Sequence, residues 1–410
     1  MALFGRTFLI NLSRNEGVIF RSIKIGGVEQ GVGGQRLARW ATTRITSPPK
    51  PSWWKNYSKL VGLGFGAGAL VSTAYMYHLY TKVATPIPNS SAGGQYVLAK
   101  KPPTFSPSRS IQIPTDSTGL KMTLFQFQTC PFCCKVRTFL DYFGLSYEVI
   151  EVNSVTRSQT RWTDYRKVPF LVVQLPNSEE ILQLKDSTMI ISVLQSFLNN
   201  KTANLQDLVK CYPLVAYSDG RKTHIEVMNR YFLMYGQHPS DRSQEDIVEE
   251  RKWRKWVDDV FVHVLSPNVY RTPKEAFQAF EWFSKVGSWE EHFATWERLL
   301  VIYVGAVAMF FIGKNLKRRH QLKDDVRQSF YEETNVWLEA LKKKGTKFMG
   351  GDHPNLSDLA VYGVLTAVEG CEAFHDLKQN TTISLWFEHM RETVSQHGGA
   401  ILTTEKGNVA

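Results

Sequence analysis

Apolar and polar side chains alternate in the middle of the chain and then change to a helical repeat within a few residues. Residues 122–128 alternate in this way and are rich in aromatic side chains, as in a strand with one buried face. Apolar side chains then recur at helical spacing from Val136 to Phe143 and stop before Gly144. This part of the chain is therefore predicted to form a strand followed by a helix.

The same pattern predicts three more strands and another helix. Residues 147–152, 168–173 and 181–184 have the composition of strands, and the second of these has a Val-Pro pair at its start. Asp186 and Ser187 then precede a strongly apolar helical repeat. The order of elements predicts a layered α/β domain.

The pattern changes again from residue 251 onward. The spacing there is helical, beginning with Trp253, Trp256 and Val257, and no segment alternates as a strand does. We therefore expect an all-α second domain. An apolar run at 299–312 is short for a membrane span and is predicted to be a buried helix of this domain. The basic residues behind it, at 314–319, form either a solvated face or a contact with an anionic membrane.

Two cysteines, Cys130 and Cys133, flank Pro131 at the junction between the first predicted strand and its helix. Pro131 suits the first helical position, because the N–H that it lacks has no partner there. Cys130 then lies at the N-cap, where unpaired backbone N–H groups and the helix dipole favour a thiolate. Cys133 lies one turn further in and acts either as a resolving thiol or as packing.

The remaining cysteines do not support a metal site. Cys134, Cys211 and Cys371 stand alone in spacing, so a four-cysteine zinc site would lack its second pair, and no metal is expected. Two structural cysteines at 130 and 133 would leave the strand-to-helix junction and Pro131 unexplained. Five cysteines in 410 residues also argue against a disulfide-rich secreted protein.

This order of elements resembles the glutaredoxin and glutathione-transferase branch of the thioredoxin fold. The resemblance implies that Pro169 follows a cis peptide bond and that Val168 offers its backbone N–H and C=O to the cysteinyl part of glutathione. It also implies that Asp186 and Ser187 receive the γ-glutamyl group at a helix N-terminus. From the residues alone, either Asp186 or Ser187 is equally an ordinary helix cap.

A capped helix near the C-terminus extends this resemblance. Asn355 followed by Asp358 three residues later predicts a capping-box start for a buried helix, similar to the core helix of glutathione transferases. The expected fold is an α/β thioredoxin-like (glutaredoxin-like) N-terminal domain plus an all-α glutathione-transferase-like C-terminal domain, preceded by a single transmembrane helix.

Four longer motifs, at 125–136, 165–169, 266–273 and 354–364, resemble the family of membrane-associated prostaglandin E synthases of type 2. The resemblance covers about residues 119–395. It implies isomerisation of prostaglandin H2, a lipid endoperoxide, to prostaglandin E2, with Cys130 as the catalytic thiol and Cys133 supporting it. It also implies a homodimer, bound glutathione, and haem with the glutathione sulfur as a ligand; with haem bound, the endoperoxide is degraded instead.

One position departs from that family. Its members carry a tyrosine three residues before the first cysteine, and this chain has Phe127 there. The tyrosine hydroxyl is thought to hydrogen-bond the catalytic sulfur, and such a bond to a charged group is worth about 1.5–3 kcal/mol. Two functions therefore stay open: the isomerase, and a glutaredoxin-like thiol oxidoreductase or a glutathione- and haem-binding module.

The N-terminal part of the sequence concerns location. Residues 1–55 hold nine basic and two acidic residues, so +7 of the net charge of +11 lies in this arm. The basic charge is therefore mainly a property of the arm and gives little support for nucleic-acid binding, which is not expected. This arm resembles a mitochondrial transit peptide or, alternatively, a disordered arm, whereas the family resemblance implies the Golgi. Residues 60–80 carry no formal charge and have aromatic flanks, as a single membrane span does.

Prolines and serines between residues 85 and 118 indicate a flexible tether, where cleavage would release a soluble form. The expected parts of the chain are a basic leader or targeting arm (1–57), a transmembrane helix (58–82), a Pro/Ser-rich linker (83–118), a glutaredoxin/thioredoxin-like domain (119–199), a second linker (200–209), a helical domain (210–397) and a tail (398–410).

Overall fold

The computed structural model describes residues 95–176, 178–200, 203–218, 223–235 and 242–400. All of them belong to one compact unit, Ala84–Ala410. The predicted leader and the predicted transmembrane helix at 58–82 lie outside the described residues.

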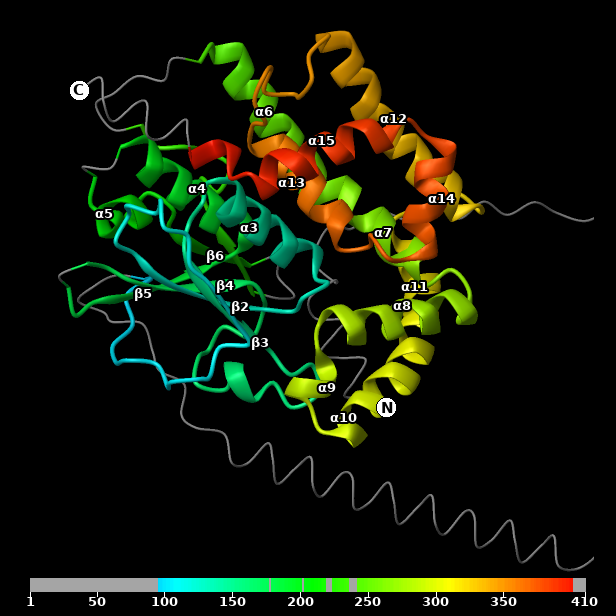
Figure 1. The fold of residues 1–410 in the computed structure, drawn as a ribbon, viewed down its shortest axis with the longest axis horizontal. Helices are drawn as coiled ribbons and strands as arrows, with labels where there is room; N and C mark the ends of the chain where they lie inside the picture. The colour runs from blue at the N-terminus through cyan, green and yellow to red at the C-terminus, as the bar shows by residue number, and fades with distance from the viewer. Residues whose placement is uncertain (1–94, 177, 201–202, 219–222, 236–241, 401–410) are drawn as a thin grey trace, which may run out of the picture. The chain divides into compact units, whose positions relative to one another are not determined.

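A five-stranded sheet forms the first half of this unit (Figure 1). Its strand order is β1-β3-β2-β4-β5, in which β2 and β3 are parallel and the other neighbours are antiparallel. The strands are β1 (Arg109–Ile111), β2 (Lys121–Gln126), β3 (Tyr147–Glu151), β4 (Phe170–Gln174) and β5 (Ile181–Lys185). The four predicted strands are therefore present, with ends that differ by one or two residues.

Both faces of the sheet are covered by apolar side chains, whereas the alternation at 122–128 predicted a strand with one buried face; that part of the prediction is wrong. Leu124 pairs with Val149 and with Leu171, and all three are fully buried beneath helices α3 (Pro131–Tyr142) and α4 (Ser187–Asn199). The next residue in β2, Phe125, points to the opposite face and stacks on Phe170 at 4.5 Å between ring centroids. Two separate apolar layers therefore hold the sheet.

Part of the predicted linker contributes to this core. Tyr96 and Val97 are buried, Val97 forms an isolated bridge with Leu182, and β1 pairs with β3. Pro102, Pro103 and Pro107 stand between these short contacts, so composition alone could not reveal them. The second predicted linker likewise contains a short helix, α5 (Leu205–Lys210).

Helices form most of the second half. They are α6 (Gln244–Trp256), the π-helical turn η2 (Val257–Phe261), α7 (Val262–Val269), α8 (Pro273–Val286), α9 (Trp289–His292), α10 (Thr295–Leu300), the π-helical turn η3 (Val301–Gly305), α11 (Ala306–Arg319), α12 (Val326–Lys344), α13 (Leu356–Thr366), α14 (Glu372–Asn380) and α15 (Ile383–Ser395). The expected all-α region needs one correction, because β6 (Leu214–Ser218) and β7 (Thr223–Val227) form a hairpin. An Asp-Gly pair between two alternating segments, at 219–220, is a sequence signal that could have predicted this hairpin.

The predicted helix at 299–312 is present, but the prediction that it is buried is wrong. Helices α10, η3 and α11 run continuously from Thr295 to Arg319, and only 33% of the most apolar window is buried. Among the described residues, this is the one helix long and apolar enough to span a membrane by length and composition.

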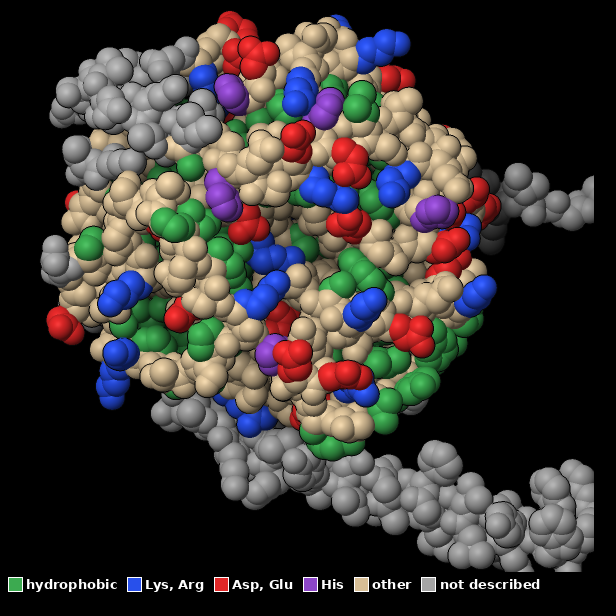
Figure 2. All heavy atoms as spheres, in the orientation of Figure 1, with side chains coloured by type: hydrophobic (Ala, Val, Ile, Leu, Met, Phe, Trp, Pro, Cys, Tyr) green, Lys and Arg blue, Asp and Glu red, His purple; other side chains and the backbone are tan. Residues whose placement is uncertain are grey.

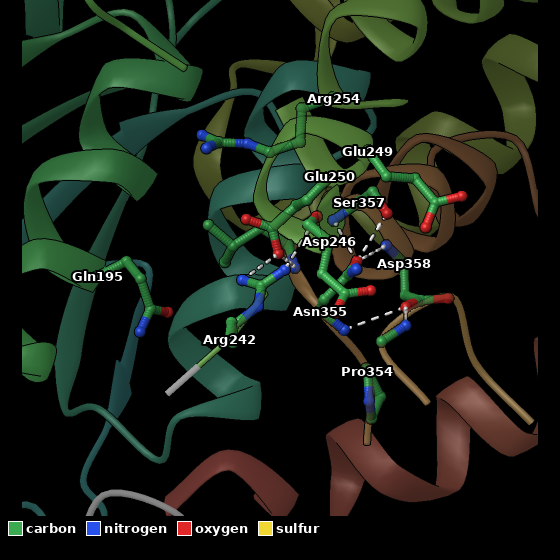
Figure 3. Close-up of polar contacts among 12 residues, drawn as sticks. Gln195, Arg242, Asp246, Glu249, Glu250, Arg254, Pro354, Asn355, Ser357 and Asp358 are labelled. Carbon is green, nitrogen blue, oxygen red and sulfur yellow. Dashed lines mark hydrogen bonds and ion pairs between the residues drawn. The ribbon is translucent and has the colours of Figure 1, made fainter. Parts of the chain in front are cut away.

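Helix α13 begins with the predicted capping box. The Asn355 side chain accepts from the N–H groups of Ser357 (2.9 Å) and Asp358 (3.2 Å), and the Asp358 carboxylate accepts from the N–H of Asn355 (3.0 Å) (Figure 3). Glu250 of α6, held by Arg242 at 2.9 Å, accepts the N–H of Leu356 at 3.2 Å. These bonds satisfy the backbone donors of a buried helix end.

Helix α13 packs directly against α3, behind the two cysteines. The close approach depends on Gly363, because a Cβ atom there would lie 2.7 Å from the Cα of Lys135. The helical region therefore supports the helix that carries Cys130 and Cys133.

Candidate active site

Cys130 occupies the N-cap of α3, as predicted, with extended backbone angles (φ −77°, ψ 124°) and Pro131 in the first turn. Its carbonyl accepts the first helical bond from the N–H of Cys134 at 2.9 Å, and its own N–H donates to the Phe127 carbonyl at 3.1 Å. Cys130 is partly exposed, whereas Cys133 is completely buried. The junction between β2 and α3 thus presents one accessible sulfur.

The two sulfurs are electrostatically unequal. A hydrogen bond from the Cys133 thiol lowers the pKa of Cys130; burial opposes this shift, and the N–H groups of Cys133 and Phe132 and the charge of Arg137 add to it. Burial raises the pKa of Cys133, and so does its hydrogen bond to Cys130. Cys130 is therefore suited to be the thiolate and Cys133 the protonated donor.

Cys134 is a packing residue with a polar neighbour. Its thiol donates to the Gln128 carbonyl at 3.4 Å and lies 3.1 Å from Arg137 Nη2, and burial raises its pKa. Arg137 also donates to the Gln128 carbonyl at 2.7 Å and to the Gln126 side chain. Its donors are thus directed away from Cys130.

A second arginine, which the sequence did not single out, lies close to Phe127. The Arg157 guanidinium is 5.4 Å from the centroid of the Phe127 ring and donates to the Arg166 carbonyl at 2.6 Å. Burial and Arg166 lower the pKa of Arg157, while the charge of Cys130 raises it. The charge of the Cys130 thiolate therefore acts on Arg157, which lies beside Phe127, the position where the family resemblance implies a tyrosine.

Asp186 caps α4, as one of the two readings of the sequence predicted. Its Oδ1 accepts from the N–H groups of Thr188 (2.9 Å) and Met189 (3.1 Å), and its Oδ2 lies 3.3 Å from Arg230 Nη1. Ser187, next to it, is buried. Burial lowers the pKa of Arg230, but the charges of Asp186, Tyr231, Asp258 and Asp259 together outweigh it, and the net shift is upward. A cation thus accompanies the predicted γ-glutamyl position.

Tyr165 lies between the two cysteines and the helix cap at Asp186 in its electrostatic effects. The Val168–Pro169 peptide bond downstream of it is cis, as the resemblance implied. Burial raises the pKa of Tyr165, and the charges of Asp186, Cys133 and Cys130 add to this shift, whereas the N–H of Asp186 opposes it. Its hydroxyl therefore lies within electrostatic reach of both the helix cap and the thiols. The sequence pattern included Tyr165 in a motif but gave it no role.

A buried ion pair anchors the site to the helical region. Lys135 of α3 pairs with Asp258 of η2, whose carboxylate also accepts from Thr188 (2.6 Å) and Tyr231 (3.1 Å). Burial raises the pKa of Asp258, but Lys135, Thr188 and Arg230 together outweigh this and the net shift is downward. No sequence signal predicted this pairing, because its partners are far apart in the chain.

The sheet order, the cis proline, the thiol at a helix N-cap and the helical second half define a protein of the thioredoxin and glutathione-transferase class. Residues 124–200 match the family model for the glutathione S-transferase N-terminal domain. A glutathione transferase F7 from Populus trichocarpa is 12% identical, with a TM-score of 0.38 over 68% of this chain and 99% of that one.

Two relatives are more specific. Prostaglandin E synthase 2 from Danio rerio is 43% identical over 286 residues, which cover 68% of this chain and 72% of the relative. The protein of the same name from Mus musculus is 44% identical over 284 residues, with the same two coverages. The chain belongs to the prostaglandin E synthase 2 family, and the prediction of an enzyme of this family is confirmed.

Proposed function

We propose that this chain isomerises prostaglandin H2 to prostaglandin E2 with the thiolate of Cys130. The observation that carries the proposal is the position of Cys130 at the N-cap of α3 with a partly exposed sulfur. A hydrogen bond from the Cys133 thiol and the N–H groups of Cys133 and Phe132 lower its pKa. The names and identities of the relatives supply the substrate class. An acyl-chain substrate would approach the partly exposed sulfur rather than the buried Cys133.

The reaction is redox-neutral and can be balanced around a single thiolate. Attack of the Cys130 sulfur on one endoperoxide oxygen forms an S–O bond and breaks the O–O bond, and the other oxygen takes a proton to become the hydroxyl. Loss of a proton from the carbon that bears the sulfur-bound oxygen then forms the ketone. The S–O bond breaks in the same step and returns the thiolate.

Glutathione is proposed to bind beside Cys130. The backbone of Val168, ahead of the cis Pro169, is suited to pair with the cysteinyl part, and the start of α4 at Asp186 and Ser187 to receive the γ-glutamyl group. Arg230 adds a positive charge 3.3 Å from Asp186, which suits a carboxylate ligand. Bound glutathione would position a second thiol for exchange with Cys130.

Haem binding, which the resemblance implies, has less support in the structure than glutathione binding has. Among the described residues, no group of three or more His, Cys, Asp or Glu side chains could hold a metal ion. The implied ligand is the glutathione sulfur, so the fit of haem depends on glutathione rather than on a donor set of this chain. No step of the proposed reaction goes through haem.

A thiol oxidoreductase is the second candidate. The hydrogen bond between Cys133 and Cys130, with opposite pKa shifts, is also the arrangement of an exchanging dithiol. Phe127 favours this candidate, because the ring lacks the hydroxyl that would orient the sulfur. Dithiol exchange needs both cysteines, whereas isomerisation needs only Cys130.

Product analysis with the full chain in detergent distinguishes the two. Prostaglandin H2 and glutathione are mixed with the wild type, with Cys130→Ser, with Cys133→Ser and with Cys211→Ser, a control at an exposed cysteine. We expect prostaglandin E2 above the spontaneous rate in all but Cys130→Ser. No acceleration by the wild type, together with reduction of a protein disulfide that Cys133→Ser cannot perform, would establish the oxidoreductase instead.

The location and assembly expected from the sequence are part of this proposal. The chain is proposed to be a single-pass membrane protein anchored through 58–82, in the Golgi or the mitochondrion, with a soluble form released by cleavage. It is also proposed to be a homodimer. Crosslinking in cells and fractionation of organelles test these points.

A further inference from the structure

Six large apolar side chains are exposed along one face of the helix that runs from Thr295 to Arg319. Each is 42–62% exposed, and their spacing is three or four residues except at the adjacent pair Tyr303 and Val304: Trp296, Leu299, Tyr303, Val304, Val307 and Phe311. We call them the apolar stripe. Figure 2 shows hydrophobic side chains gathered over this part of the molecule, at the lower right. A continuous exposed apolar face of this kind marks an interaction surface.

The opposite face of this helix is fixed to the domain. Val301, Ala306 and Met309 are buried, and η3 and α11 pack against α8 and α7. A Cβ atom at Gly305 would lie 2.8 Å from the Phe280 ring of α8, so the two helices touch closely. Crossing a bilayer would require this packed face to separate from the domain, which favours a helix that keeps its position and offers only the apolar stripe.

Positive charge continues the apolar stripe at its C-terminal end. Lys314 and Arg318 follow Phe311 by three and seven residues, which places them on the same face. The Lys314 ammonium lies 4.3 Å from the Phe310 ring centroid, so its stem runs along apolar surface while its charge reaches outward. The sequence from Arg298 to Lys323 contains no acidic residue.

An apolar face with aromatic side chains and a basic end matches the chemistry of a membrane interface. Trp, Phe and Leu side chains enter the boundary between headgroups and acyl chains, and Lys and Arg pair with anionic headgroups. The helix from Thr295 to Phe311 is about 25 Å long at 1.5 Å per residue, long enough to lie along the membrane surface. If a second copy of the chain packed its own apolar stripe here, Lys314 and Arg318 would find no acidic residue of that face to pair with.

We propose that the apolar stripe, with Lys314 and Arg318, lies in the headgroup layer of a membrane that contains anionic phospholipid. This contact is separate from the predicted span at 58–82. It holds the compact unit flat on the lipid surface, where an apolar endoperoxide is most concentrated.

Hydroxyl-radical footprinting of the full chain tests the proposal residue by residue. The chain is reconstituted into vesicles of phosphatidylcholine alone or with phosphatidylserine, and oxidation of Trp296, Tyr303 and Phe311 is measured by mass spectrometry. We expect several-fold lower oxidation in the vesicles with phosphatidylserine, and recovery at high salt. Phe232, which is 45% exposed elsewhere on the unit, serves as the internal control and should not change.

Charge reversal identifies the headgroup contact. Lys314→Glu combined with Arg318→Glu should abolish the difference between the two kinds of vesicle, whereas Lys342→Glu combined with Lys343→Glu, an equal charge change at exposed positions of α12, should preserve it. Equal oxidation in both kinds of vesicle overturns the proposal. Protection that appears without lipid and grows with protein concentration also overturns it, because a second copy then covers the apolar stripe.

Discussion

The guanidinium of Arg157 lies 5.4 Å from the centre of the Phe127 ring, and the Phe127 carbonyl accepts the backbone N–H of Cys130. A positive charge and an aromatic ring thus lie beside Cys130 at the position where the family resemblance implies a tyrosine hydroxyl. The charge of Cys130 in turn raises the pKa of Arg157 against the effect of burial. We therefore expect the cation to replace part of the missing donor.

Restoring the hydroxyl should therefore increase thiolate character further. We expect Phe127→Tyr to raise the rate of prostaglandin E2 formation about tenfold, since a hydrogen bond to a charged group is worth about 1.5–3 kcal/mol and 1.4 kcal/mol is about a factor of ten. The measurement is the initial rate of product formation from prostaglandin H2. A variant with unchanged rate and unchanged Cys130 pKa would show that the ring edge does not face the sulfur.

Removing the charge of Arg157 should decrease the thiolate character of Cys130. In Arg157→Met the pKa of Cys130 is expected to rise toward the ordinary value for a cysteine thiol, about 8.5, while Arg157→Lys keeps part of the effect. The measurement is the pH dependence of iodoacetamide alkylation at Cys130, followed by peptide mass spectrometry. Arg161→Met is the matched control, because Arg161 also bonds a loop carbonyl, that of Thr156 at 3.0 Å. Equal shifts in the two methionine variants would contradict a specific role.

Local patterns predicted the parts of the site that lie within one element. Cys130 at an N-cap follows from a strand, a proline and a helical repeat that are adjacent in sequence, and so does the cap at Asp186. The cation near Phe127 and the one near Asp186 come from a loop and from the segment after the hairpin. No periodicity marks such residues, because their positions are set by how the chain returns to the sheet.

Burial was harder to predict than helicity. The repeat at 299–312 correctly indicated a helix, but an apolar run does not say which of its faces meets the domain. Val301 and Val304 have the same side chain, yet the first is 6% exposed and the second 43%. The difference arises from packing against α8, a long-range contact that composition does not contain.

The contact between α3 and α13 should be sensitive to a single methyl group. In Gly363→Ala the new Cβ would lie 2.7 Å from the Lys135 Cα and 2.9 Å from its backbone nitrogen, so one helix must move. We expect a loss of about 1–3 kcal/mol in the free energy of unfolding, the usual range for overpacking. Gly313→Ala is the control, because its nearest contact would be an ordinary 3.4 Å and alanine favours a helix. Equal effects in urea denaturation would argue against close packing at Gly363.

The cap of α13 should make stability depend on pH in a defined direction. Burial raises the pKa of Asp358 to about 6, although the N–H groups of Met349, Asn355 and Gly350 and the indole of Trp386 lower it. In the unfolded chain its pKa is near 3.9. Between these values the folded state binds more protons, so the contribution of Asp358 to stability falls as pH rises from about 4 to 6.

Asp358→Asn isolates this effect, because the amide does not titrate. The free energy of unfolding of the wild type, minus that of Asp358→Asn, should decrease by about 2 kcal/mol between pH 4 and pH 7, since one pKa unit corresponds to about 1.4 kcal/mol and the unfolded chain is already half titrated near pH 4. Urea denaturation of both proteins at several pH values gives this difference. A difference that increases with pH would mean that the N–H donors outweigh burial, and would place the pKa of Asp358 below its ordinary value.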